Sequence, residues 1–272
     1  MAGLAGADAG AADDVARGGL AVRLRGVSKT YDNGVTALAP LDLAIERGEF
    51  VSLLGPSGCG KSTALRLIAG LSAPTGGTVE VSRGGADRAG HAIGFVFQEP
   101  TLMPWASVAD NVGLPLKLSG LGRAEVAACA RAALTRVGLA DFAEVYPREL
   151  SGGMKMRVSL ARALVTDPDI LLMDEPFAAL DEITRFRLND DLLALWRGLH
   201  KTVVFVTHSV FESVYLSQRV IVMTPRPGRI SAQFRIEADE PRGAPFRTSV
   251  GYAGQCREVS IALARASGEA AP

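Results

Sequence analysis

Alternating apolar and polar positions predict a half-buried strand over residues 20–27, in which Leu20, Val22 and Leu24 share one face. An Asn-Gly pair at 33–34 favours a tight hairpin turn after it, because both residues tolerate positive φ. Further strands are predicted at residues 41–45, 50–54, 78–81, 93–97, 170–173, 203–206 and 220–223. Several of these runs are apolar on both faces, which is typical of a parallel sheet covered by helices.

Helical patterns lie between these strands. One helix is predicted over 62–69, where Gly70 closes it, and another begins after Ser151-Gly152-Gly153. From 108 to 138 the periodicity is helical, with Gly138 as C-cap and an apolar face made of Val126, Ala130, Ala133, Leu134 and Val137. Beyond Pro241 the pattern is weakly periodic, and we favour a helix packed on the core over a regulatory addition. The order of elements indicates an α/β protein.

Composition excludes several classes of protein. Of 272 residues, 48% are apolar and 21% charged, which suits a globular core, and 29 basic residues balance 29 acidic ones. A neutral chain has no bulk positive field with which to hold nucleic acid. No apolar run approaches the ~20 residues of a membrane-spanning helix. The three cysteines are too scattered for a disulfide framework and fit a reducing compartment.

The N-terminal stretch, residues 1–19, is rich in Ala and Gly and lacks the basic start and apolar centre of a secretory signal. It would bury too little surface to offset its ordering entropy, so we expect a disordered extension. The protein is expected to stay in the cytosol.

A phosphate-binding loop is the strongest chemical signal. The pattern Gly-x4-Gly-Lys-Ser/Thr lies between a predicted strand and a predicted helix and is made by Gly55, Pro56, Ser57, Gly58, Cys59, Gly60, Lys61 and Ser62. Backbone N–H groups of such a loop converge on phosphate oxygens, and the helix N-terminus adds its positive dipole end. Lys61 would reach the β- and γ-phosphates of a nucleotide, and the Ser62 hydroxyl would bind Mg²⁺.

Polar residues also follow three buried strands. Asp174 ends one of them, where it would emerge beside the phosphate loop as a metal ligand, and Glu175 would then point at an attacking water. Taken alone, an Asp-Glu-Pro sequence is as often a turn or a helix cap. His208 and Gln98 each follow another strand, and the residues themselves leave a structural role as open as a functional one.

A second anion site is predicted where Ser151-Gly152-Gly153 opens a helix. Because the phosphate loop already holds the phosphates, one solution is that two copies face each other and each offers this helix to the other's γ-phosphate. No Asn-Lys-x-Asp guanine-reading motif occurs, which disfavours a GTPase.

With these motifs, the sequence resembles the ATP-binding cassette (ABC) ATPases over about residues 20–230. The ordered motifs are an upstream aromatic residue, Walker A, Q-loop, signature, Walker B, adjacent glutamate, D-loop and switch histidine, at Tyr31, 55–62, Gln98, 150–157, 170–174, Glu175, 179–181 and His208. The resemblance implies a P-loop NTPase fold, a RecA-like parallel sheet with an antiparallel β subdomain. It also implies an ABC domain at 20–232, with a helical subdomain inserted at about 100–165, followed by a partly helical tail at 233–272.

The resemblance also implies roles for these residues. Tyr31 would stack on adenine, unless it packs locally in its hairpin, and Thr63 would join the loop residues in binding ATP. Mg²⁺ would be held by Ser62, Gln98 and Asp174. Glu175 would be the general base and His208 would bond the γ-phosphate. ATP on the opposite subunit would be contacted by Ser151, Gly152 and Gly153, with Asp181 across the dimer interface.

Residues 98–105, 110–112 and 225–229 are similar to the nitrate, sulfonate and taurine importer branch. This implies a homodimer on ATP binding, two transmembrane permease subunits, and a periplasmic binding protein, with the chain peripheral on the cytoplasmic face of the inner membrane. Residues 98–111 would receive a permease helix, and Trp105 would line that groove or be a structural residue. We expect 225–229 to be a rigid turn rather than a ligand site.

Alternatives concern cargo and class. A vitamin precursor of pyrimidine or riboflavin type stays open as cargo, since other subunits select it. A soluble ABC protein of DNA repair or translation is disfavoured by the single cassette and neutral charge. A module that binds ATP without hydrolysis is disfavoured by Glu175 and His208. Met154 and Met156 depart from the family's usual Gln, which affects only the fine geometry of the signature.

Overall fold

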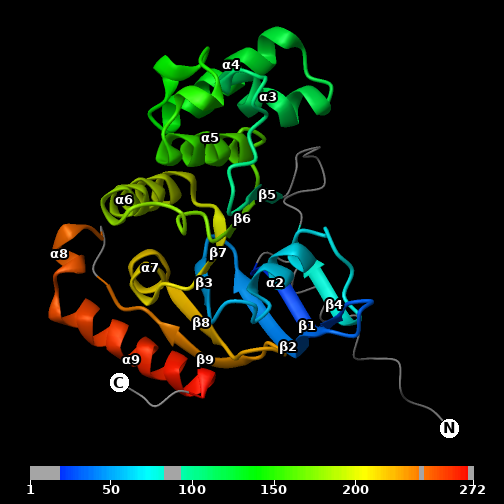
Figure 1. The fold of residues 1–272 in the computed structure, drawn as a ribbon, viewed down its shortest axis with the longest axis vertical. Helices are drawn as coiled ribbons and strands as arrows, with labels where there is room; N and C mark the ends of the chain where they lie inside the picture. The colour runs from blue at the N-terminus through cyan, green and yellow to red at the C-terminus, as the bar shows by residue number, and fades with distance from the viewer. Residues whose placement is uncertain (1–18, 83–92, 239–241, 269–272) are drawn as a thin grey trace.

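Two β-sheets and several helices make up the described part of this computed structural model, residues 19–82, 93–238 and 242–268 (Figure 1). The predicted extension at 1–19 lies outside that part except for Gly19. The smaller sheet is antiparallel, in the order β2-β1-β4, and consists of β1 (Leu20–Thr30), β2 (Thr36–Glu46) and β4 (Gly76–Val81). The predicted hairpin is confirmed, since the Gly34 N–H donates to the Tyr31 carbonyl at 2.9 Å.

The larger sheet has the order β5-β6-β7-β3-β8-β9. Its strands are β3 (Phe50–Leu54), β5 (Ile93–Val96), β6 (Ile170–Asp174), β7 (Thr202–Thr207), β8 (Arg219–Met223) and β9 (Ile230–Arg235). All neighbours pair in parallel except β9, which is antiparallel to β8. Strands β3, β6 and β7 are buried throughout, as their two-sided apolar runs predict. Strand β9 was not among the predicted strands, although burial alternates along it.

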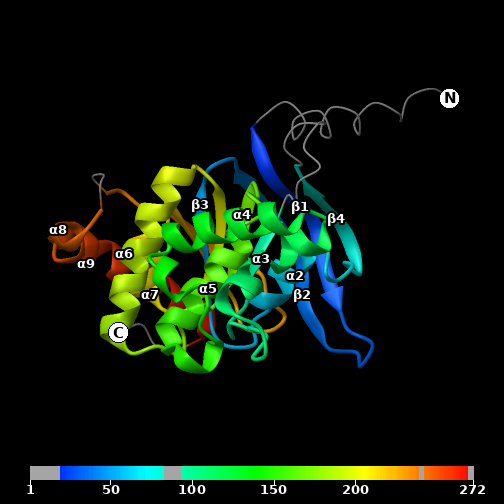
Figure 2. The ribbon, with the colours of Figure 1, turned by 90° about the horizontal axis from the view of Figure 1, so that it is seen from above.

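Helices at one end of the molecule form a separate layer with its own apolar cluster (Figures 1 and 2). They are α3 (Val108–Leu118), α4 (Arg123–Arg136), α5 (Gly152–Leu164) and the short 3₁₀ turns η1 (Ala140–Phe142) and η2 (Pro147–Glu149). The helical periodicity over 108–138 is therefore two helices, and the break contains Gly120 at φ 84°. Strands β5 and β6, on either side of this layer in the sequence, are neighbours in the same sheet. This confirms that a helical subdomain is inserted in the sheet domain.

The remaining helices pack on the larger sheet or on one another. They are α2 (Lys61–Ile68), α6 (Glu182–Leu199), α7 (Val210–Leu216), α8 (Ala244–Arg247) and α9 (Val250–Ser267). Helices α6 and α7 were not predicted. In α6, exposed Ile183 and Phe186 obscure the periodicity of the apolar face. No helix in the described ranges is both long and apolar enough to cross a membrane.

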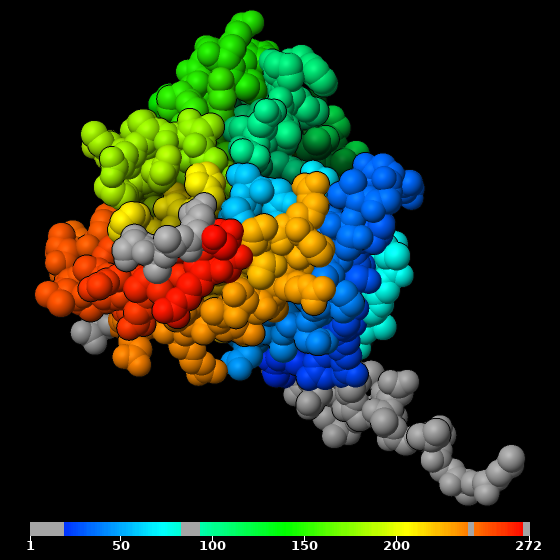
Figure 3. Space-filling view, turned by 60° about the horizontal axis from the view of Figure 1, so that its bottom comes forward, coloured from blue at the N-terminus to red at the C-terminus, as the bar shows by residue number. Residues whose placement is uncertain are grey.

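The tail helix α9 lies along the β8–β9 side of the sheet (Figure 3). Its Tyr252, Cys256 and Val259 are buried in the main core cluster. In α8, Arg247 is 2.8 Å from the Asp190 carboxylate of α6 and lies 4.0 Å from the centre of the Tyr215 ring of α7. The tail thus joins α6 to α7.

Candidate functional site

The phosphate loop connects β3 to α2 and is shaped by close backbone packing. Gly60 has φ 103°, and a Cβ there would lie 2.8 Å from the Ala37 carbonyl oxygen, so another residue would not fit. Gly60 is also the N-cap of α2 and supplies no side-chain cap, which leaves the first N–H groups of α2 for an anion. A pocket of about 360 Å³ opens here, lined by Tyr31, Asn33, Val35, Ala37, Gly58, Gly60, Lys61, Ser62, Thr63, Glu175 and Arg226.

Lys61 is a buried cation at the floor of this pocket. Its side chain is 3% exposed, and Nζ donates to the carbonyls of Gly55 at 2.7 Å and Pro56 at 3.0 Å. The Glu175 carboxylate lies 3.6 Å from the same nitrogen. The amine is therefore held by two neutral carbonyls and one carboxylate. Phosphate oxygens, which form stronger charge-assisted hydrogen bonds, can replace the two carbonyls.

Ser62 and Asp174 bring two hard oxygen donors together. The Ser62 hydroxyl donates to Asp174 Oδ1 at 2.7 Å, from the start of α2 to the end of β6. Burial raises the pKa of Asp174, and the hydrogen bond from Ser62 partly opposes that shift. A hydroxyl and one carboxylate fit the way in which Mg²⁺ is held beside nucleotide phosphates, with few protein ligands.

Glu175 and His208 meet because their strands are neighbours. The Glu175 N–H donates to the Val206 carbonyl at 3.0 Å, and the residue adopts φ 44°, a conformation that is strained for a residue with a side chain. Glu175 Oε2 then lies 3.3 Å from His208 Nδ1. One carboxylate therefore faces Lys61 on one side and the histidine on the other.

Tyr31 stands at the rim of the pocket and is 37% exposed. Its hydroxyl is 3.1 Å from Thr63 Oγ1, and Lys29 Nζ lies 5.5 Å from the centre of its ring. Cys59, by contrast, is buried in the core, and burial raises the pKa of its thiol. Only the backbone of Cys59 is available for an anion.

Several predicted site residues do not line the pocket. Within the phosphate loop and at the strand ends these are Gly55, Pro56, Ser57, Cys59, Asp174 and His208, and at two helix N-termini they are Ser151, Gly152, Gly153 and Asp181. Ser151 caps α5 by accepting from the Met154 N–H at 3.3 Å, and Asp181 caps α6 by accepting from the Thr184 N–H at 2.9 Å. That N–H lowers the pKa of Asp181. Gln98 is exposed just beyond β5, which is next to β6 in the sheet, and it too is outside the pocket lining.

Two departures in the signature segment are packing residues. Met156 is 4% exposed and belongs to the main core, and Met154 packs against the cluster of the helical layer. Both side chains pack in the interior, so the segment exposes the N-terminus of α5 and the Ser151 hydroxyl to solvent.

Arg226 is a charged pocket residue that was not among the predicted site residues. It lies in the turn between β8 and β9 and donates from Nε to the Gly58 carbonyl at 3.2 Å. The only signal for it was the Pro-Arg-Pro-Gly-Arg sequence, which was predicted to be a rigid turn.

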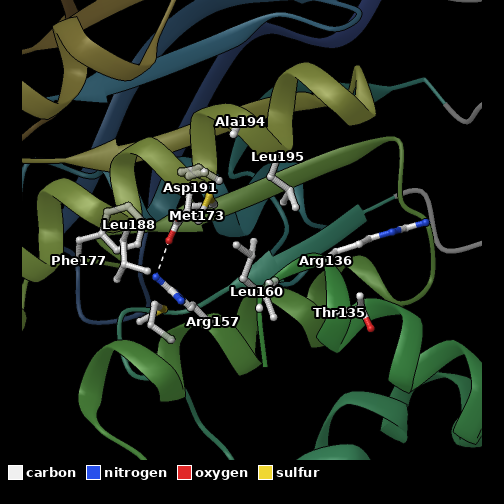
Figure 4. A pocket seen from close by; sticks show the side chains of 14 residues that line it. Thr135, Arg136, Arg157, Leu160, Met173, Phe177, Leu188, Asp191, Ala194 and Leu195 are labelled. Atoms are coloured by element: carbon white, nitrogen blue, oxygen red, sulfur yellow. Dashed lines mark hydrogen bonds and ion pairs between the residues drawn. The ribbon is translucent and has the colours of Figure 1, made fainter. Parts of the chain in front are cut away.

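A second pocket, of about 490 Å³, lies between α4 and α5 of the helical layer and α6 (Figure 4). Arg157 of α5 and Asp191 of α6 span its edge with an ion pair of 2.5 Å. Leu160, Met173 and Phe177 contribute to a largely apolar wall. Such a wall does not bind a polyphosphate, so the pocket at the phosphate loop is the candidate site.

The fold and these side chains define a phosphate-loop nucleotide-binding protein. Residues 38–178 match the ABC transporter family. The chain is 47% identical over 207 residues to the taurine import ATP-binding protein TauB of Rhizobium johnstonii, covering 76% of this chain and 79% of that protein. It is 48% identical over 202 residues to the nitrate import ATP-binding protein NrtD of Synechocystis sp., covering 74% and 76%.

A solved dimeric structure of an ATP-binding cassette in a post-hydrolysis state, bound to ADP and Pi, has a TM-score of 0.69 and 36% identity to this chain. The match covers 80% of this chain and 100% of that one. The protein therefore belongs to the ABC transporter family and is an ATP-hydrolysing cassette of that family.

Proposed function

We propose that this cassette energises import of a small solute of the nitrate, sulfonate or taurine kind. The observation that carries the ATPase chemistry is the Glu175 carboxylate, 3.6 Å from Lys61 and 3.3 Å from His208 above the phosphate loop. The import role is supported by the relatives, which are named for taurine and nitrate import.

In this proposal Lys61 exchanges the carbonyls of Gly55 and Pro56 for the β- and γ-phosphate oxygens of ATP. Glu175 accepts a proton from the water that attacks the γ-phosphorus, and His208 orients that carboxylate and bonds the phosphate. Mg²⁺, held by Ser62 and Asp174, would neutralise charge on the phosphate oxygens. Tyr31 would stack on the adenine ring.

A second copy completes each site. Ser151, Gly152 and Gly153 lie outside the pocket of their own chain, so we assign their contact to ATP held by the partner. Asp181 would face the same interface. The dimeric state of the similar solved cassette supports this arrangement.

The segment at 98–111 would receive one permease helix, so that two copies of the chain would bind the two permease subunits. Trp105 is 76% exposed there, and Phe97 is 38% exposed. Buried Asn111 fixes the segment by accepting from the Met103 N–H at 2.7 Å and donating to the Met103 carbonyl at 3.1 Å. A rigid segment with an exposed Trp suits a protein contact. Gln98 would sense that contact and bind the metal or the water.

In this assembly the chain is peripheral on the cytoplasmic face of the inner membrane, and a periplasmic binding protein delivers the solute to the permease.

Uptake assays in a strain lacking this chain test the proposal. Complementation with wild type should restore uptake of labelled taurine, an alkanesulfonate or nitrate, and Lys61→Ala should not. Trp105→Glu should keep ATPase activity in the purified chain but lose uptake. The matched control is Val250→Glu, another exposed apolar residue at 90% exposure, and it should keep both. Restored uptake of a vitamin precursor alone would contradict the proposed cargo, and normal uptake with Trp105→Glu would contradict the proposed docking face.

A further inference from the structure

The turn at 225–229 is pressed onto the phosphate loop. The Gly228 N–H donates to the Ala37 carbonyl at 2.9 Å, and the Ala39 N–H donates to the Gly228 carbonyl at 3.1 Å. A Cβ at Gly228 would lie 2.0 Å from the Cys59 carbonyl oxygen, so only glycine allows this approach. The turn is therefore fixed both to β2 and to the phosphate loop.

This contact brings Arg226 to the pocket. Arg226 is exposed and lines the same space as Lys61 and Tyr31. Its Nε donates to the Gly58 carbonyl, and its Nη2 would lie 3.1 Å from a Cβ at Gly58. Within the described part of the chain, no carboxylate forms an ion pair with it. The guanidinium thus has one backbone partner and several N–H donors left over.

We propose that Arg226 binds the phosphate chain of the nucleotide directly, as a second cation beside Lys61. The inference rests on the proposed nucleotide site and adds a residue to it. ATP brings several negative charges into a pocket whose lining has Lys61 and Arg226 as cations and Glu175 as an anion. A guanidinium offers paired N–H donors that match two phosphate oxygens, and its bond to Gly58 restricts it to the mouth of the loop.

Substitutions separate this contact from a purely mechanical role in bracing the loop. Arg226→Lys keeps the charge but loses the planar fork, whereas Arg226→Gln can still donate to the Gly58 carbonyl without a charge. Arg229→Gln is the matched control, an exposed arginine of the same turn that does not line the pocket. The dissociation constants of ATP and of adenosine are measured by displacement of a fluorescent ATP analogue, at low and high salt.

Arg226→Gln should weaken ATP binding about tenfold and reduce its salt dependence, because a charged hydrogen bond at an exposed site is lost. Adenosine binding should not change, and Arg226→Lys should recover most of the ATP affinity. Arg229→Gln should bind ATP within about twofold of wild type.

Three results would overturn the inference. If Arg226→Gln kept its ATP affinity and Arg226→Lys lost it, the hydrogen bond to the Gly58 carbonyl would be the only role of this residue, and the phosphate contact would be excluded. Equal loss of ATP and adenosine would indicate a misshapen pocket, and unchanged ATP affinity in both variants would exclude the contact. If wild type itself failed to bind ATP, the proposed function would be wrong rather than the role of Arg226.

Discussion

Replacing Glu175 with Gln tests the catalytic geometry most directly. The carboxylate lies 3.6 Å from Lys61 Nζ and is 17% exposed, so at an effective dielectric constant of about 20 the two charges attract by about 4–5 kcal/mol before desolvation. The γ-phosphate of ATP would meet the same carboxylate with the opposite sign. Glu175→Gln removes both the general base and that repulsion.

Hydrolysis by Glu175→Gln should fall by about 10²–10⁴, the usual contribution of a positioned base. ATP affinity should stay equal or increase, because the repulsion is lost while the Gly55 and Pro56 carbonyls still hold Lys61 in place until ATP binds. The ATP-bound variant should accumulate as a closed dimer. Steady-state phosphate release and light scattering with ATP measure these two effects.

Glu258→Gln, an exposed glutamate of α9, is the matched control and should hydrolyse ATP like wild type. Turnover by Glu175→Gln within about tenfold of wild type would remove Glu175 from the role of base. An ATP-bound variant that stays monomeric would refute the shared site instead.

Two further substitutions test the metal pair and the tail. Burial raises the pKa of Asp174, so its negative charge lowers the stability of the folded protein at a pH above the ordinary carboxyl value. Asp174→Asn should therefore unfold at an equal or higher temperature than wild type, although it should lose ATPase activity. The difference should grow as pH rises from the ordinary carboxyl value through the raised one and vanish below both, and a less stable Asn variant at neutral pH would contradict this. Arg247→Ala removes the contacts with Asp190 and Tyr215. It should lower the free energy of unfolding by about 1 kcal/mol, or the melting temperature in calorimetry by about 2–4 °C. An unchanged melting temperature would show that these contacts do not stabilise the protein.

Much of the site could be predicted because parallel strands deliver their ends to one edge of a sheet. Asp174 ends a buried strand, and Glu175 and His208 each follow one. Because β6 and β7 are neighbours, a local pattern located residues that meet in space. The phosphate loop could be predicted because its glycines and Lys61 lie within one short segment of the sequence. The fold class followed from the same two-sided apolar runs.

Other features depend on contacts that no local pattern encodes. Arg226 meets Gly58 across 168 positions of sequence, and only the packing of Gly228 on Cys59 makes that approach possible. Helix α6 has exposed apolar residues on its outer face, which hides its buried side from periodicity. The tail looked weakly periodic because few of its side chains are buried; Tyr252, Cys256 and Val259 provide the packing.

Helix capping and anion binding are compatible in one side chain. Ser151 uses its oxygen to accept from the Met154 N–H, which leaves the hydroxyl hydrogen free to donate to a phosphate. Asp181 accepts from the Thr184 N–H and stays exposed, and that bond lowers the pKa of its carboxyl, which favours the anion. Each cap therefore fixes the orientation of its side chain, which the proposed contact across a dimer would use, and Met156, a buried residue of α5, packs that helix on the core.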